Sequence, residues 1–448
     1  MSIQRHILHD EIVAYLDRPE KILCIEGVRQ TGKTTAIEIA VKGRSHVLIT
    51  MTDETFPVKN LASTDDFKTF ESYLRRDFGF VPDGKQILVI DEAQKFKKLY
   101  GFLMQMNRLW KNVPVILSGS VMGAFFYEQE TEKSVSPAGR VQRKICRPFS
   151  FYEFLDLVNE HALLEELHAF DFSRAIPDHM HRHALSLWRD YLVCGGMPEA
   201  IRRRESTKDL YEYFQNLLAF FWQDADRYIS EMSGDRKTQF GSLFRTVLEA
   251  IARLTCQPTT RSSILSSDSP AYRTVLPLLL NAAEGWHFIF RLTSKMKSMT
   301  TKQGTSSKKY LWDVGVMNHL LNASRPIPPD DQRGLLPLAL ENFVAQELVF
   351  YLGHKDRLFS WKSSQKQPKE MDFMAQFVDR DVGIEVKSSH QTNFKAISQL
   401  QIFSKIHPQA SLAVVYLGVF QTITHNGHRI HLIPPYLLGA LGTTNPGG

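Results

Sequence analysis

The sequence predicts an α/β protein with a parallel sheet at its N-terminal end, a helical middle and a second α/β unit at its C-terminal end. Three observations lead to this prediction. The chain has 448 residues, enough for about three domains of ordinary size. A glycine-rich loop at 27–34, GVRQTGKT, lies between an apolar segment and a helical pattern. Near the other end, KEMDFMAQF at 369–377 and IEVK at 384–387 place acids and a lysine in strand-like segments.

The composition is that of an ordinary globular protein, with 43% hydrophobic and 23% charged residues. The longest apolar runs, such as 411–420, are too short to span a bilayer, and the first residues lack the apolar core of a signal peptide. The four cysteines are far apart, which favours free thiols in a reducing compartment. We therefore expect a cytoplasmic protein without membrane contact, whose net charge of +6 is compatible with nucleic-acid binding.

Strand-like and helical patterns alternate over the first 148 residues. Such alternation is typical of a parallel sheet with helices on both faces. The strands are expected at 21–26, 46–51, 86–92 and 113–119. We place the end of this domain at Pro148, because the pattern that follows is helical.

Three further segments are predicted after this boundary. Residues 149–235 form a helical extension without strand-like segments. In 236–300, three helical patterns precede a strand-like segment, which is the order of a winged helix and suggests a DNA-binding module. Helices and strands then mix in 309–440, as expected for a C-terminal α/β domain.

The loop at 27–34 has the spacing of a Walker A motif in the required context, between a strand and a helix. Its glycines let backbone N–H groups surround phosphates, Lys33 is placed to contact the β and γ oxygens, and the Thr34 hydroxyl is a ligand for Mg²⁺. The residues predicted to bind the nucleotide are Gly27, Arg29, Gln30, Thr31, Gly32, Lys33, Thr34 and Thr35. The predicted cofactors are therefore ATP and Mg²⁺.

Two acids follow the buried strand at 87–90. We expect Asp91 to hold Mg²⁺ through water and Glu92 to polarise the attacking water, which indicates hydrolysis. Either Ser118 or Ser120, at the end of the next strand, would sense the γ-phosphate. Arg140 would either add positive charge in the transition state, in its own subunit or in a neighbour of a homo-oligomer, or be an ordinary surface arginine.

The order of several short segments resembles the prokaryotic ATP-binding AAA-type proteins that carry a C-terminal domain of unknown function, the DUF4143 class. The resemblance covers nearly the whole chain and is carried by EGVRQTGKTT, VIDEAQ, LSGS, AGR, RPFSFYEFL, YLVCGGMPEA, KKYLWDVG, ENFVAQEL and KEMDFMAQF with IEVKSS. It implies a P-loop ATPase domain, a winged-helix-like middle and a restriction-endonuclease-like end. The segments PAGR and WDVG depart slightly from the usual motifs.

The C-terminal acids and lysine resemble the site of PD-(D/E)xK nucleases. Glu385 and Lys387 are two residues apart on a strand and therefore share a face, and Asp372 lies on the preceding strand. Two carboxylates there would hold Mg²⁺, and the lysine would orient water at a phosphate. Glu341, on the preceding helix, matches a further acid of this fold, so the predicted metal ligands are Glu341, Asp372 and Glu385, with Glu385 and Lys387 catalytic.

Two hypotheses of function remain open at this point. In the first, a Mg-dependent ATPase controls a nuclease-like domain that acts on DNA. In the second, the protein is a nucleotide-controlled switch that binds nucleic acid or protein without cutting. A P-loop kinase is disfavoured, because the pair Asp91 and Glu92 suits water activation and no site for a phosphate acceptor is visible.

Overall fold

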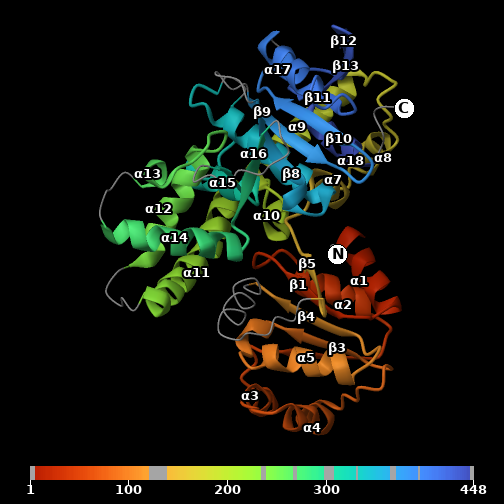
Figure 1. The fold of residues 1–448 in the computed structure, drawn as a ribbon, viewed down its shortest axis with the longest axis vertical. Helices are drawn as coiled ribbons and strands as arrows, with labels where there is room; N and C mark the ends of the chain where they lie inside the picture. Colours follow the sequence, from red (N-terminus) through yellow and green to blue (C-terminus); the bar gives the residue numbers. More distant parts are fainter. Residues whose placement is uncertain are drawn as a thin grey trace. The chain divides into compact units, whose positions relative to one another are not determined.

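The computed structural model describes residues 6–120, 139–233, 239–265, 270–296, 307–328, 331–363, 370–391 and 394–443 (Figure 1). The chain forms two compact units. The N-terminal unit consists of 1–147 with 285–287, and the C-terminal unit consists of 148–284 with 288–448.

The N-terminal unit contains a parallel sheet in which the strand order is β2-β3-β4-β1-β5. The three central strands are buried along their whole length, as their unbroken apolar runs predict. Strand β4 separates β1 from β3, so it lies between the two strands that lead into the glycine-rich loop and the acid pair. The strands are β1 (Ile22–Glu26), β2 (His46–Thr50), β3 (Ile87–Asp91), β4 (Val115–Gly119) and β5 (Val141–Ile145).

Helices cover both faces of this sheet, because successive strand residues point to opposite sides. Leu23, Val89 and Ile116 pack with α1 (His6–Asp17) and α2 (Lys33–Val41). Their neighbours along the strands pack on the other face, where the helices are α3 (Phe56–Ala62), α4 (Phe67–Phe78) and α5 (Leu99–Leu109). The predicted P-loop type of α/β sheet is confirmed.

The C-terminal unit combines helices with a mixed sheet of eight strands, in the order β12-β13-β11-β10-β9-β8-β6-β7. The strands are β6 (Ile289–Met296), β7 (Lys308–Leu311), β8 (Leu358–Lys362), β9 (Glu370–Gln376), β10 (Asp381–Val386), β11 (Ser411–Val415), β12 (Gln421–His425) and β13 (His428–Ile433). Strand β6, expected within the winged-helix-like segment, pairs with β7 and β8. It is therefore part of the same sheet as the C-terminal acids.

The first helices of this unit fall in the segment predicted to be helical: α7 (Phe151–Leu157), α8 (His161–His168), α9 (Asp178–Cys194), α10 (Pro198–Arg202) and α11 (Thr207–Ser233). The remaining helices are α12 (Phe240–Arg253), α13 (Arg261–Ile264), α14 (Pro270–Gly285), α15 (Val314–Asn322), α16 (Leu335–Leu352), α17 (Phe394–Ser404) and α18 (Leu438–Thr443). Among the described residues, α16 alone is long and apolar enough to cross a membrane by length and composition, and 72% of it is buried inside the unit.

Several of the quoted motifs meet in the core of the C-terminal unit. Asp313 caps the N-terminus of α15, accepting a hydrogen bond from the Val316 N–H at 2.9 Å, and also accepts one from the Gly196 N–H at 2.8 Å. A Cβ on Gly196 would lie 2.1 Å from the carbonyl oxygen of Phe149. RPFSF, CGGMP and WDVG are thus segments that need one another to pack.

Candidate nucleotide site and C-terminal acidic cluster

The glycine-rich loop connects β1 to α2 in a conformation that requires its glycines. Gly27 has φ +151° and Gly32 has φ +88°, both in the region that side chains disfavour. A Cβ on Gly27 would lie 2.2 Å from the carbonyl oxygen of Cys146, so the backbone just after strand β5 also excludes any larger residue there. The loop leads into the N-terminus of α2, where free backbone N–H groups and the helix dipole favour an anion.

Lys33 is folded back onto the loop. Its ammonium group donates to the carbonyl oxygens of Gly27 at 3.0 Å and Val28 at 2.8 Å, and the residue is buried. Thr31 closes the same turn by donating to the Val28 carbonyl oxygen at 2.8 Å. These contacts hold the lysine at the centre of the loop, where it is within reach of a phosphate in the cradle.

The hydroxyl of Thr34 and the carboxylate of Asp91 meet at the end of β3. Thr34 Oγ1 donates to Asp91 Oδ2 at 2.9 Å, although the two residues are 57 positions apart in the chain. Oxygen ligands of this kind suit Mg²⁺, so the pair predicted to hold the ion lies together. The backbone N–H of Glu92 binds the other Asp91 oxygen at 3.0 Å, which orients the carboxylate.

Glu92 follows directly and has φ +52°, an uncommon backbone conformation for a residue other than glycine. Its carboxylate accepts a hydrogen bond from the Gln94 side chain at 2.5 Å. This contact of Gln94, from the same DEAQ segment, was not predicted from the sequence.

The two serines at the C-terminal end of β4, Ser118 inside the strand and Ser120 just after it, make different contacts. Ser118 is fully buried and donates to Asp91 Oδ1, which ties β4 to β3. Ser120 accepts from the side chain of Arg29 at 3.4 Å, and so lies beside the loop. Because β4 lies between β1 and β3, both serines reach the site, but only Ser120 contacts a loop residue among the described contacts.

Arg140 lies at the other end of the sheet. Its carbonyl oxygen accepts from the N–H of Ile22 at the start of β1, whereas the loop begins after the last residue of β1. Five strand residues separate the two ends, about 16 Å at 3.3 Å per residue. Its side chain donates to the sulfur of Met104 at 2.9 Å. The structure therefore does not bring Arg140 to the loop of its own subunit. Action on a neighbouring subunit stays a prediction, beside the alternative of an ordinary surface arginine.

In the C-terminal unit, β9 and β10 pair antiparallel with Ile384 opposite Phe373. Asp372 is thereby placed beside β10, as predicted, and its Oδ2 accepts from the Val386 N–H at 3.0 Å. Lys387 donates to Glu385 Oε1 at 2.6 Å. Burial raises the pKa of Glu385 to about 7, and the nearby Asp372 carboxylate adds to this rise while Lys387 opposes it.

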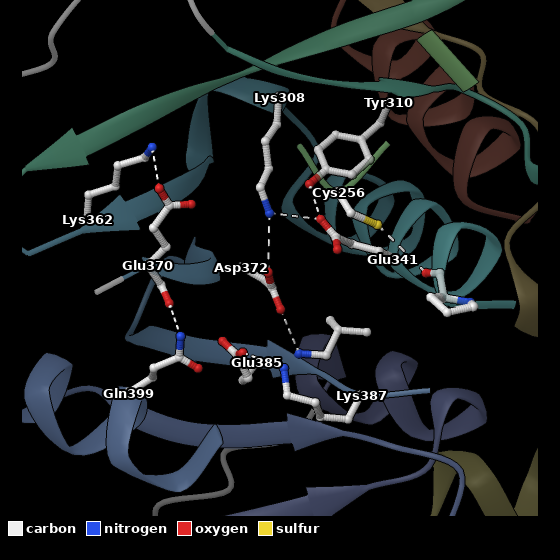
Figure 2. A network of polar contacts seen from close by, with 12 residues as sticks. Cys256, Lys308, Tyr310, Glu341, Lys362, Glu370, Asp372, Glu385, Lys387 and Gln399 are labelled. Carbon is white, nitrogen blue, oxygen red and sulfur yellow. Dashed lines mark hydrogen bonds and ion pairs between the residues drawn. The ribbon is translucent and has the colours of Figure 1, made fainter. Parts of the chain in front are cut away.

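A second lysine occupies the space between the acids. The ammonium group of Lys308, from β7, lies 2.9 Å from Glu341 Oε1 and 3.2 Å from Asp372 Oδ1 (Figure 2). Glu341 also accepts from the hydroxyl of Tyr310 at 2.7 Å. Within the described residues, no group of three His, Cys, Asp or Glu side chains is arranged to hold a metal ion. The predicted ligand set Glu341, Asp372 and Glu385 therefore does not form a metal site in this arrangement.

The other polar residues of the ENFVAQEL segment bind groups of the chain itself, most of them on the backbone. Asn342 accepts from the N–H of Leu311 at 2.9 Å and donates to its carbonyl oxygen at 3.0 Å. Gln346 accepts from the Val314 N–H, and Glu347 accepts from the Phe151 N–H at 3.1 Å. Helix α16 thus joins β7, α15 and α7, which explains its polar residues inside the core.

This fold and loop define a P-loop nucleotide-binding protein. Three family models match separate parts of the chain. Residues 19–155 match an AAA domain (AAA_14), 185–326 match a domain of unknown function (DUF8612), and 338–436 match a domain of unknown function (DUF4143). The chain thus carries an AAA-type P-loop ATPase domain followed by a DUF4143 domain, and the predicted resemblance is confirmed for these two domains. The winged-helix-like middle and the restriction-endonuclease-like end stay predictions. The middle match was not predicted.

Similar solved structures include a Walker-type ATPase of Pyrococcus abyssi, with 16% identity and a TM-score of 0.44 over 71% of this chain and 96% of that one. The ORC2 protein of Aeropyrum pernix is 13% identical, with a TM-score of 0.33 over 71% of this chain and 92% of that one. No curated protein matches the chain.

Proposed function

We propose that this protein is a Mg-dependent ATPase whose nucleotide state controls the C-terminal unit. The proposal is carried by the contact of Thr34 with Asp91 at 2.9 Å beside a complete Walker A loop. Thr34 and Asp91 would hold Mg²⁺, which when bound neutralises charge on the phosphates. This set of oxygens, next to the N-terminus of α2, fits both the ion and the phosphates.

Each remaining residue of the site has a separate task. The N–H groups of the loop bind phosphate oxygens, and Lys33 exchanges its two carbonyl partners for them. Glu92 is held by Gln94 until water arrives, and would then accept a proton from that water. The water oxygen would bond to the γ-phosphorus while the bond from that phosphorus to the β–γ bridging oxygen breaks, so that ADP is the leaving group. Ser120 lies beside the loop, where it accepts a hydrogen bond from the loop residue Arg29, and it reports on the γ-phosphate.

Steady-state ATP hydrolysis with Mg²⁺ tests this part of the proposal. We expect Lys33→Ala to lose nucleotide binding and hydrolysis together. Glu92→Gln should retain binding and lose hydrolysis by about 10²–10⁴-fold, the usual contribution of a general base. Wild-type protein that binds ATP without hydrolysing it would contradict the assignment of Glu92. Transfer of phosphate to an added small molecule would instead favour a kinase.

For the C-terminal unit, we propose recognition of nucleic acid or protein without cutting. The supporting observation is the position of Lys308. Its ammonium group forms ion pairs with Glu341 and Asp372, the two carboxylates that a nuclease would use as metal ligands. Incubation of single- and double-stranded DNA and RNA with Mg²⁺ or Mn²⁺, with and without ATP, is expected to show no cleavage. Cleavage that disappears in Glu385→Ala would restore the hypothesis of an ATP-controlled nuclease.

A further inference from the structure

We propose that Lys308 replaces a divalent metal ion in the C-terminal acidic cluster, so that this unit is held together and functions without metal. The acidic cluster comprises Glu341, Asp372 and Glu385. This inference deepens the proposed function. The part that concerns a switch without cleavage rests on that proposed function, whereas the replacement of the metal is supported by the contacts of Lys308 alone.

The ammonium group lies where two carboxylates from different elements converge (Figure 2). Glu341 comes from α16 and Asp372 from β9, and one oxygen of each accepts a hydrogen bond from Lys308, at 2.9 and 3.2 Å. These are hydrogen-bond distances, whereas Mg²⁺ needs oxygens at about 2.1 Å and several waters around it. The side chain of Lys308 is 6% exposed, so the position is inside the unit.

The strand register fixes this lysine. Alternate residues of β7 point to the same side, and Lys308 and Tyr310 both contact Glu341 Oε1. Lys309 points the other way and contacts Thr259 and Ser307. Strand β7 pairs with β6, with Lys308 opposite Leu292, so a change in the position of Lys308 would require the pairing to shift. Lys308 is therefore built into the sheet.

Two further oxygens of the cluster are also paired with groups of the chain itself, whereas Glu385 Oε2 is buried without a hydrogen-bond partner. Asp372 Oδ2 accepts from the Val386 N–H, and Glu385 Oε1 accepts from Lys387. Lys308 and Lys387 together supply two positive charges to three carboxylates. The cluster is left with at most one net negative charge, too little to compensate the dehydration of a divalent ion.

Mn²⁺ binding to the full chain without nucleotide, measured by the loss of the free-ion EPR signal, tests the proposal. All proteins carry Asp91→Asn, which removes the carboxylate of the nucleotide site. We expect no bound ion in this parent, because Lys308 fills the position. Addition of Lys308→Met should give one bound Mn²⁺ per chain, and further addition of Asp372→Asn should remove it.

Lys362→Met is the matched control, because Lys362 pairs with Glu370 at 2.5 Å on β8 and β9 of the same sheet but is 30% exposed. It should gain no Mn²⁺. A parent protein that binds one Mn²⁺ per chain, with binding lost on Asp372→Asn, would overturn the proposal. A folded Lys308→Met protein that gains no ion would do so as well.

A second measurement does not depend on the folding of Lys308→Met. With 1 mM Mn²⁺, roughly the range of weak cation sites, the melting midpoint of the parent should stay unchanged, whereas an open metal site predicts a rise that Asp372→Asn abolishes. Such a rise would refute metal replacement. ATP hydrolysis by wild-type protein is measured separately: its absence would refute the proposed ATPase and leave the Mn²⁺ result standing.

Discussion

At the scale of single residues, the backbone of the nucleotide site leaves little room for substitution of its glycines. Gly27→Ala would force a Cβ to 2.2 Å from the Cys146 carbonyl oxygen at φ +151°. We expect the loop to move and ATP binding to fall by at least tenfold, measured by isothermal titration. Gly43→Ala is the control: its φ is also positive, at +79°, but no atom lies within 4 Å of the added Cβ. Equal binding by both variants would show that the loop adapts.

The residues of the two sites differ in how far the sequence predicts them. The nucleotide-site residues are contiguous at 27–35, so their spacing alone places them, and Asp91 joins them because strand ends meet at one edge of a parallel sheet. Lys308 and Lys309 are adjacent and identical in type. Only the register of β7 decides which one faces the acids, and a single sequence does not contain that register.

At the scale of elements, we expect the packing of α16 in the C-terminal unit to depend on the hydrogen bonds of its buried amide side chains. Asn342→Leu would leave both the N–H and the carbonyl group of Leu311 without the partners that the side chain supplies. The free energy of unfolding should fall by about 2–4 kcal/mol, since each buried unsatisfied group costs about 1–3 kcal/mol. Urea denaturation measures this loss. Gln332→Leu, at an exposed position before the helix, should change stability by less than about 0.5 kcal/mol.

The Asp313 cap makes the stability of the C-terminal unit depend on pH. Burial raises the pKa of Asp313 to about 6, although hydrogen bonds from Gly196, Val316 and Gly315 oppose the rise. The folded state therefore binds this proton more tightly than the unfolded state. Its contribution to stability is complete below about pH 4 and is lost as pH rises through 6, an effect on the order of 3 kcal/mol.

Asp313→Asn should remove this dependence, so its free energy of unfolding relative to wild type should rise between pH 4 and 7, measured by urea denaturation. Asp66, which caps α4, gives a control of opposite sign. Hydrogen bonds from Thr69 lower the pKa of this exposed residue, so Asp66→Asn should become relatively less stable as pH rises through about 4. A flat difference for Asp313→Asn would contradict the raised pKa.

The elements themselves were largely predictable, because unbroken apolar runs such as 87–90 give buried strands. The assignment of β6 was harder. Three helices followed by a strand are locally the pattern of a winged helix, but β6 pairs with β8, more than 60 residues later in the chain. That pairing depends on contacts distant in sequence. The same limit applies to Arg140, whose place follows from the pairing of β5 with β1.

At the scale of the whole molecule, the two units allow the control part of the proposed function to be tested directly. ATP that binds only the folded N-terminal unit stabilises it by about 2.7 kcal/mol at a hundredfold excess over Kd. If that unit alone responds, amide exchange should slow in β3 and stay unchanged in β10. If nucleotide controls the C-terminal unit, part of the free energy of ATP binding must be coupled to the stability of that unit. Amide exchange should then change in both strands.

We expect changes in both strands, measured by hydrogen exchange and mass spectrometry in Glu92→Gln protein, which should hold ATP without consuming it. Lys33→Ala is the control, because a protein that does not bind nucleotide should show neither change. Protection confined to β3 in a protein that binds ATP would leave the ATPase assignment intact and remove the proposed control. The distinction is sharp because Asp91 lies in β3 and Glu385 lies in β10, so the two strands carry the two sites themselves.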